Sequence, residues 1–268
     1  AVGFTGSLAG GRALFNLCMS RPEPIPFFGE LGSVNPMFCL PKAMQTRAGA
    51  LAQGWAASLT MGAGQFCTNP GIAFVIAGAQ ANEFAEASIA ALSGAGAQAM
   101  LTDGIASAYR HGTNAVASAA HVEPLFTTES VGRTALPNLF RVSLEHWLHS
   151  PDLQEEVFGP LGIIVEANDI DEMVAAAGAI EGQLTCTLQM EDGDKAHAQR
   201  LLPHLERKAG RVLVNGFPTG VEVAGAMVHG GPYPASTNFG ATSVGTMAIR
   251  RFLRPVCYQN MPADLLPA

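Results

Sequence analysis

The stretch LGIIVEANDIDEMVAAAGAIEGQLTCTLQM, residues 161–190, decides the fold class. Its first seven residues are mostly aliphatic and have the length of a buried strand, and LTCTLQM at 184–190 has the same character. Residues 170–179, which lie between these runs, have helical spacing. A strand, a helix and a second strand in this order predict a right-handed βαβ unit with parallel strands.

The same alternation continues on both sides of this stretch. Strand-like runs occur at VNPMFCL (34–40), IAFVIAG (72–78) and RVLVN (211–215). Helices are predicted around 45–60, 83–100, 103–119 and 194–208, and from Ser7, a suitable N-cap, to Cys18. The chain is therefore predicted to be an α/β protein with a mostly parallel sheet.

Composition excludes several classes of protein. With 268 residues, 48% of them hydrophobic and 14% charged, the chain can bury a large core and is globular. A net charge of -7 gives no basic surface for nucleic acid or an anionic membrane. Five scattered cysteines argue against a disulfide framework, and no secretory signal or membrane-length apolar run is visible. We expect a cytoplasmic location.

The character of the chain changes after about Gly230. The run GGPYPASTNFGATSVG (230–245) predicts a long loop, and AIRRFLRPVCYQN (248–260) predicts a strand. A loop of this length in a compact domain is usually functional or contacts a neighbour. We expect the strand to extend the sheet of another subunit in a homo-oligomer.

Three separate motifs carry candidate chemistry, and the first is GFTGSLAGGR at 3–12. A glycine-rich turn that enters a helix presents free backbone N–H groups and the positive end of the helix dipole to an anion. The same pattern also fits an ordinary tight turn between a strand and a helix. Without further motifs, the two interpretations are equally good.

The second motif is FFGELGSVNPMF at 27–38, where Glu30 stands among apolar residues and glycines. Desolvation raises the pKa of a carboxyl group toward the range useful for a general base. A glutamate in a solvated loop is the alternative.

The third motif is GAGQFCTNPG at 62–71, in which Cys67 has polar and glycine neighbours. Cys18, Cys39 and Cys186 instead lie within aliphatic runs, as structural cysteines do. Cys67 is therefore the candidate nucleophile, although a structural role is open for any single cysteine.

Taken in order, GFTGS, FGELG and GQFC resemble the aldehyde dehydrogenase superfamily. The resemblance continues in EEVFGP (155–160) and VNGFPTG (214–220), and it covers essentially the whole chain as the C-terminal, catalytic portion of such a protein. GFPTGVEV, AMVHGGPYPA and RRFLRPVCYQN resemble the branch that contains α-ketoglutaric semialdehyde (2,5-dioxovalerate) dehydrogenases and NADP-dependent fatty aldehyde dehydrogenases.

The resemblance implies a role for each matching residue. Cys67 would be the catalytic nucleophile and Glu30 the general base. Gly6, Ser7, Gly32, Glu156 and Phe158 would bind the cofactor, NADP or NAD. The aldehyde would form a thiohemiacetal and then a thioester on Cys67, and hydrolysis would release the acid. No metal is expected, since the HxxH spacing of His146 and His149 lacks an obvious third ligand.

The resemblance also implies three regions: a remnant of the Rossmann-like cofactor domain (1–33), the catalytic domain (34–235), and a C-terminal loop with an oligomerisation strand (236–268). Family members have further sequence before the GFTGS turn, which supplies the rest of the cofactor site and a second oxyanion donor. We therefore expect the chain to need a missing N-terminal half for full activity.

Two other functions stay open at this point. One is a truncated, non-catalytic remnant that acts in assembly or regulation. The other is a thiol hydrolase in which a histidine serves Cys67 as base, which requires an imidazole near the thiol. His229 in MVHGG resembles a position near the substrate entrance of the family, and no role is assigned to it.

Overall fold

The structure is a computed structural model and describes residues 1–267. Its main part is a seven-stranded sheet in the order β11, β10, β3, β4, β9, β8, β6. Neighbouring strands are parallel except for the β6 and β8 pair. The predicted α/β class with a mostly parallel sheet is therefore confirmed. The strands are β3 (Met37–Cys39), β4 (Ile72–Ile76), β6 (Glu123–Phe126), β8 (Asn138–Ser143), β9 (Leu161–Ala167), β10 (Gln183–Gln189) and β11 (Ala209–Val214).

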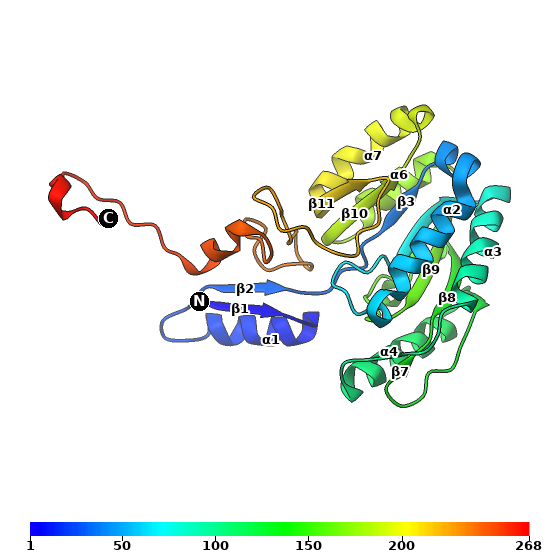
Figure 1. Ribbon diagram of the computed structural model, residues 1–268, viewed down its shortest axis with the longest axis horizontal. Coiled ribbons are helices and arrows are strands. Elements are labelled where there is room, and N and C mark those ends of the chain that lie inside the picture. Colours follow the sequence, from blue (N-terminus) through cyan, green and yellow to red (C-terminus); the bar gives the residue numbers. More distant parts are fainter. Residues whose placement is uncertain (268) are drawn as a thin grey trace.

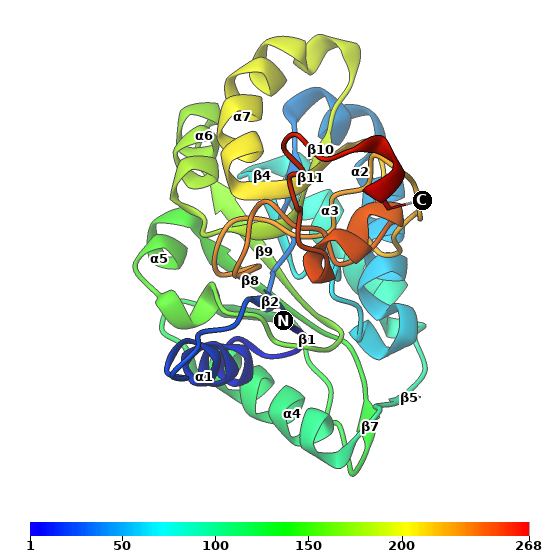
Figure 2. The same ribbon diagram turned by 90° about the vertical axis from the view of Figure 1, so that its left-hand side faces the viewer.

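Helices cover both faces of this sheet, which is the arrangement expected when the strands are apolar throughout. In Figure 2 the strands run between α2 and α3 on one side and α5, α6 and α7 on the other. The helices are α2 (Pro41–Thr60), α3 (Ala79–Ser93), α4 (Asp103–Ser118), α5 (Leu144–Leu148), α6 (Ile170–Ala179) and α7 (Lys195–Lys208). A small antiparallel pair, β5 (Gln98–Ala99) with β7 (Thr134–Ala135), lies outside the main sheet.

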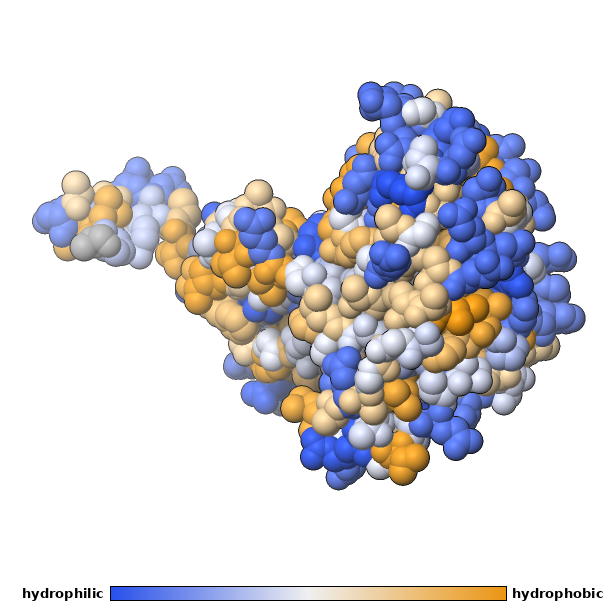
Figure 3. All heavy atoms as spheres, turned by 45° about the vertical axis from the view of Figure 1, so that its right-hand side comes forward, coloured by the Kyte–Doolittle hydropathy of each residue, from blue (hydrophilic) through white to orange (hydrophobic). Residues whose placement is uncertain are grey.

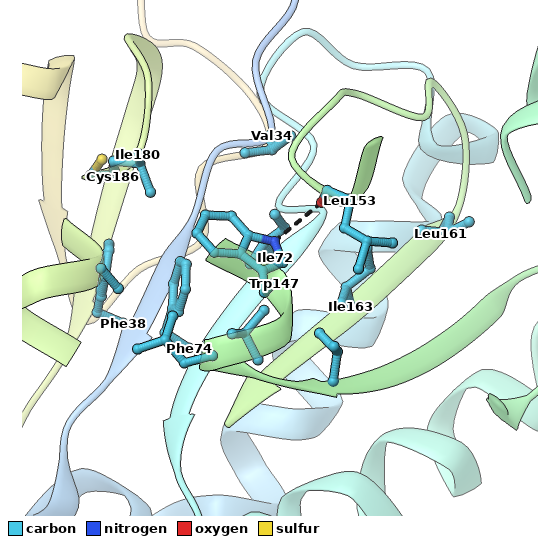
Figure 4. Close-up of a cluster of buried hydrophobic side chains, with 14 of the residues drawn as sticks. Val34, Phe38, Ile72, Phe74, Trp147, Leu153, Leu161, Ile163, Ile180 and Cys186 are labelled. Atoms are coloured by element: carbon cyan, nitrogen blue, oxygen red, sulfur yellow. Dashed lines mark hydrogen bonds between the residues drawn. The ribbon is translucent and has the colours of Figure 1, made fainter. Parts of the chain in front are cut away.

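Two hydrophobic cores follow from the alternation of side chains along the strands. Phe38 and Phe74 point to one face and stack with ring centroids 4.8 Å apart, and Trp147 meets Phe74 edge-on at 5.1 Å. Figure 4 shows this cluster, including the hydrogen bond of 3.2 Å that the indole N–H of Trp147 donates to the carbonyl of Leu153. On the other face, Met37, Cys39, Ala73 and Val75 pack with Trp55 of α2.

A separate unit precedes the sheet. β1 (Val2–Thr5) and β2 (Phe27–Glu30) form a two-stranded parallel sheet, and α1 (Leu8–Met19) connects them beside the main body (Figure 1). The side chain of Ser7 accepts a hydrogen bond of 3.3 Å from Gly10 N, so Ser7 is the N-cap of α1 as the sequence predicts. The division of the chain into three regions stays a prediction.

The C-terminal segment corrects one expectation. Residues 248–260 do not form a strand: a 3₁₀ helix spans Thr246–Phe252, and the rest is irregular up to a second short 3₁₀ helix at Ala263–Leu265. A strand needs a partner edge for its backbone groups, and no described residue offers one to this segment. The segment instead extends away from the body (Figure 1) and exposes apolar side chains (Figure 3). Within residues 1–267, every helix is too short or too polar to cross a membrane.

Candidate active site

Three side chains that are distant in sequence meet at the end of β2, where Glu30 lies. Sγ of Cys67 lies 3.2 Å from Nε2 of His229, and the same nitrogen lies 3.2 Å from Oε1 of Glu30. Glu30 and His229 are buried, with 5% and 1% of their surface exposed, while Cys67 is partly accessible. A thiol that solvent can reach therefore stands against a buried imidazole and carboxyl pair.

Cys67 lies on a loop with an unusual backbone. The loop leaves α2 through a 3₁₀ turn at Met61–Gly64, in which Ala63 has a φ of 59°. A non-glycine residue in the left-handed region costs energy and is often found at functional sites. Gly64 has a φ of 66°, and a Cβ there would lie 2.3 Å from the backbone of Gly159. This close approach brings the loop against the segment that enters β9.

Two buried asparagines hold the Cys67 loop. The amide of Asn35 donates to the carbonyls of Cys67 at 2.9 Å and Asn69 at 3.0 Å. The amide of Asn69 donates to the carbonyls of Leu59 at 3.1 Å and Gly64 at 2.8 Å. The backbone on each side of the nucleophile candidate is therefore fixed by buried side chains.

Glu30 ends β2 and is fixed from both sides. Its backbone carbonyl accepts a hydrogen bond of 3.1 Å from Gly6 N, so the Gly-rich turn and the carboxylate share one end of the small sheet. An isolated antiparallel bridge joins Glu30 to Ser236. The hydroxyl of Ser243 donates to Oε2 of Glu30. The long loop predicted at 230–245 thus packs against the carboxylate.

His229 is a functional candidate to which the sequence analysis assigned no role. Its backbone N–H donates to Oγ1 of Thr242 at 2.8 Å, and its carbonyl accepts from Ser243 N at 2.8 Å. These bonds fold the loop back on itself and aim the imidazole at Cys67. The contact spans 162 positions, so no local pattern reveals it. The only local signal is a histidine among glycines at the start of a long polar loop.

Glu30 and His229 act on each other's pKa. Burial would raise the pKa of Glu30, but the hydrogen bond and charge of His229, with hydrogen bonds from Ser243 and Cys67, outweigh burial and lower it. Burial would lower the pKa of His229, but hydrogen bonds with Cys67 and Glu30 and their charges raise it to about 9. The pair is therefore a carboxylate and an imidazolium near neutral pH. Nδ1 of His229 is buried and has no partner in the part of the chain that the structure describes.

Glu156 and Gly32 form a second group of candidate site residues. Burial raises the pKa of Glu156 to about 8, although a hydrogen bond from the backbone of Ser33 opposes this; the charge of Glu30 adds to the increase. A Cβ on Gly32 would lie only 3.1 Å from Oε2 of Glu156, so glycine leaves room for the carboxyl group. Glu156 and Phe158 line a cavity that Ser33 and Asn69 also border. The cavity therefore reaches the base of the Cys67 loop.

These groups lie at the amino ends of the main strands. Cys67 precedes β4, Glu156 precedes β9, and the loop 31–36 precedes β3. Gly6 and Ser7 lie beyond Glu30, on the small sheet. The predicted site residues thus form two groups. Cys67 and Glu30 lie at the imidazole of His229. Gly32, Glu156 and Phe158 lie beside the cavity. His146 and His149 are remote from both groups, and they are hydrogen-bonded to the hydroxyl of Ser143 and the carbonyl of Glu145.

Comparison with known proteins gives relatives over the whole chain. No family model matches. The chain is 50% identical over 269 residues to alpha-ketoglutaric semialdehyde dehydrogenase 2 of Azospirillum brasilense, covering 100% of this chain and 51% of that protein. It is 46% identical over 270 residues to alpha-ketoglutaric semialdehyde dehydrogenase of Acinetobacter baylyi, again with 100% and 51% covered. The chain thus spans about half the length of the curated relatives it matches.

Solved structures agree in fold. A gamma-glutamyl-gamma-aminobutyraldehyde dehydrogenase from Burkholderia cenocepacia has a TM-score of 0.76 at 21% identity, covering 93% of this chain and 50% of that one. Aldehyde dehydrogenase C from Pseudomonas syringae, a cysteine-to-alanine mutant in complex with NAD+ and octanal, also has a TM-score of 0.76, at 18% identity, covering 94% of this chain and 51% of that one. At these identities the likeness concerns the fold alone.

Proposed function

We propose that this chain, which matches about half the length of two alpha-ketoglutaric semialdehyde dehydrogenases, is the C-terminal portion of an aldehyde dehydrogenase. It supplies the nucleophile and general base for NAD(P)-dependent oxidation of an aldehyde to a carboxylic acid. The observation that carries this proposal is the meeting of Cys67, Glu30 and His229 within hydrogen-bonding distance. Each group has a distinct task.

Cys67 attacks the carbonyl carbon of the aldehyde as a thiolate, and the imidazolium of His229, 3.2 Å from Sγ, places a positive charge beside it. The carbonyl oxygen becomes an oxyanion, to which the backbone N–H of Cys67 donates. The nicotinamide cofactor, when bound, accepts the hydride from the substrate carbon. The substrate is then a thioester of Cys67.

Glu30 takes a proton from the water that attacks this thioester. The C–S bond breaks, the thiolate of Cys67 is restored, and the carboxylic acid leaves. The hydrogen bonds from His229 and Ser243 keep Glu30 ionised and hold its carboxylate in place. Each carboxylate oxygen can accept a second hydrogen bond, so the attacking water can bind while both of these bonds persist.

The cofactor site uses the groups next to this centre. A carboxyl group that is enclosed and has a backbone partner suits the hydroxyls of a ribose, which supports Glu156 as the ribose-binding residue. Gly32 leaves the space beside it, and Phe158 packs at the same cavity. Gly6 and Ser7 stand where α1 begins and would face the phosphates.

The substrate is proposed to be a short aldehyde that also carries a carboxylate, as in the names of the two curated relatives. Arg211 on β11 supports this. Its guanidinium donates to the carbonyls of Pro218 at 2.7 Å and Gly220 at 3.3 Å, and its buried Nε has no partner among the described residues. Burial of the guanidinium lowers the pKa of Arg211, and the charge of Cys67 opposes this shift. A substrate carboxylate would complete this half-buried cation.

Association with other polypeptides is part of the proposal. Phe239, Leu253 and Leu265 are 85%, 63% and 64% exposed. A homo-oligomer would bury this apolar surface, and so would contact with the remaining portion that the longer relatives have. We propose that activity needs this portion, because the described residues offer one backbone oxyanion donor and part of a cofactor site.

Aldehyde-dependent reduction of NAD+ and NADP+ tests the function. The chain is assayed alone and mixed with the remaining portion of the Azospirillum relative, using α-ketoglutaric semialdehyde. We expect turnover in the mixture that Cys67→Ala abolishes and Cys257→Ala leaves intact. If the two parts bind each other in the mixture but no turnover occurs, the result supports a non-catalytic assembly role instead.

A thiol hydrolase is the second candidate, and the distance between Cys67 and His229 specifically favours it. The imidazole that this function requires is present. Protection of Cys67 from alkylation separates the two functions. Protection by NAD(P)+ supports the dehydrogenase, whereas protection by an ester substrate alone supports the hydrolase.

A further inference from the structure

We propose that Cys67, His229 and Glu30 also form a binding site for a thiophilic divalent cation of the zinc type, and that occupancy blocks the nucleophile reversibly. The proposal departs from the sequence-based expectation of no metal. It goes beyond the proposed function, since cation binding depends on the geometry of three side chains and not on aldehyde oxidation.

The geometry is close to that of a three-residue zinc site. Sγ of Cys67, Nε2 of His229 and a carboxylate oxygen of Glu30 all lie within 4.8 Å of one another. In a tetrahedral zinc site, bond lengths of about 2.0 to 2.3 Å place neighbouring S and N ligands about 3.6 Å apart and N and O ligands about 3.3 Å apart. The observed distances are 3.2 Å in both cases. Shifts of a few tenths of an ångström in these two distances would admit the ion.

The ligand types predict which cations bind. A thiolate and an imidazole select Zn²⁺ or Co²⁺ over Mg²⁺ and Ca²⁺, which prefer sites made entirely of oxygen. One thiolate and one carboxylate balance the charge of a divalent ion when the imidazole is neutral. Three protein ligands leave the fourth tetrahedral position open toward the accessible side of Cys67, so an ion can enter from solvent.

The surroundings orient the ligands in advance. Ser243 holds Oε2 of Glu30, which leaves Oε1 facing the imidazole. The backbone bonds of His229 to Thr242 and Ser243 fix the direction of its ring. Such outer partners commonly change metal affinity by about 10 to 100-fold. No other group of at least three His, Cys, Asp or Glu residues in 1–267 has this ligand geometry.

Binding would remove the nucleophile and the base at once. The ion displaces the protons of the thiol and of the imidazolium, which pass to solvent, and no bond in the protein is oxidised or reduced. The ion draws electron density from Sγ and binds an oxygen of Glu30, so both groups lose reactivity. A chelator that removes the ion restores the original site.

Co²⁺ binding to the chain tests the site without an activity assay. We expect a thiolate-to-cobalt charge-transfer band and the intense visible bands of tetrahedral Co²⁺, both displaced by Zn²⁺ and unaffected by excess Mg²⁺. Cys67→Ser should abolish the charge-transfer band, and His229→Gln or Glu30→Gln should weaken binding at least tenfold. The matched controls Cys257→Ser, His146→Gln and Glu155→Gln should bind like the wild type. Loss of the band in Cys257→Ser, or no uptake by the wild type, overturns the proposal.

Alkylation of the unaltered chain covers the case in which a variant fails to fold. Zn²⁺ should protect Cys67 from iodoacetamide by at least tenfold, and EDTA should reverse this. Exposed Cys257 is the internal control and should react at the same rate throughout. Equal alkylation of Cys67 with and without Zn²⁺ overturns the proposal. Neither assay uses aldehyde or cofactor. The cation site can therefore be confirmed when the proposed dehydrogenase activity is absent, and it can be refuted when that activity is present.

Discussion

Sγ of Cys67 and Nε2 of His229 stand 3.2 Å apart, although 162 positions of sequence separate them. The imidazole is also bonded to Glu30, so one ring nitrogen serves both the thiol and the carboxylate. Nε2 can direct a single proton toward one of them at a time. The protonation of His229 therefore decides whether Cys67 faces a proton donor or a proton acceptor.

Replacing His229 with glutamine should slow alkylation of Cys67 by iodoacetamide by about tenfold or more near neutral pH. The thiolate is the reactive species, and the variant loses the imidazolium that places a positive charge beside it. Peptide mass mapping measures the rate at Cys67, with exposed Cys257 as internal reference. His146→Gln, at a partly exposed histidine remote from Cys67, should leave both rates unchanged. An unchanged Cys67 rate in His229→Gln would mean that the contact has no chemical consequence.

Glu156 should make the fold less stable as pH rises. Burial raises its folded pKa to about 8, above its ordinary value of 4.5, so the folded state holds a proton that the unfolded state has lost between these values. The free energy of unfolding should fall across this window and level off above it. Glu156→Gln, which cannot ionise, should be more stable than the wild type by about 2 to 4 kcal/mol above pH ~8, with little difference below pH ~4.5.

Urea unfolding at the two ends of that window measures this effect as a difference between variant and wild type. Taking the difference removes the contribution of His229, whose raised pKa also causes loss of stability as pH rises, between its usual value and about 9. Glu155→Gln at the exposed neighbouring position is the control and should change little. If Glu156→Gln raises the free energy of unfolding by the same amount at both pH values, ionisation of Glu156 is not the cause of the pH dependence.

The fold was predictable where strands are buried on both faces. LGIIVEA at 161–167 forms β9 with the predicted bounds, because a continuous apolar run of strand length has few alternatives. β8 was missed: NLFRVS is short and carries Arg141, which pairs with Glu123 and Glu166 at the solvent side. Residues 248–260 have strand-like composition but find no partner edge among the described residues, so composition alone misled.

The site was predictable only as far as local motifs reach. Cys67 and Glu30 each lie in a short motif whose glycine and neighbouring residues can be recognised in the sequence itself. Their catalytic roles stay predictions. His229 and Asn35 were not assigned roles, because the contacts that matter come from other parts of the chain. The amide of Asn35, for example, bonds to carbonyls 32 and 34 positions away.

Asn35→Ala should destabilise the chain by about 2 to 4 kcal/mol. The side chain is fully buried, and its loss leaves the carbonyls of Cys67 and Asn69 without the amide donor. Asn35 also has a φ of 48°, which alanine adopts less readily. Thermal or urea unfolding gives the loss, and Asn114→Ala on the exposed surface of α4 should stay within about 0.5 kcal/mol. Proteolysis within 61–69 should accelerate in Asn35→Ala, and unchanged cleavage there would show that Asn35 does not hold the loop.

Arg211→Gln should impair oxidation of an aldehyde that carries a carboxylate more than oxidation of an uncharged one. The guanidinium is half-buried and its Nε lacks a partner in residues 1–267, so a substrate carboxylate gains a charge-assisted hydrogen bond that glutamine cannot supply. We expect KM for α-ketoglutaric semialdehyde to rise about tenfold or more, since such bonds contribute roughly 1.5 to 3 kcal/mol, while KM for pentanal changes little. Arg211→Lys keeps the charge and should recover part of the affinity for the charged substrate alone. If both aldehydes lose affinity equally in Arg211→Gln, the arginine supports the 217–220 loop through its backbone bonds and does not select the substrate.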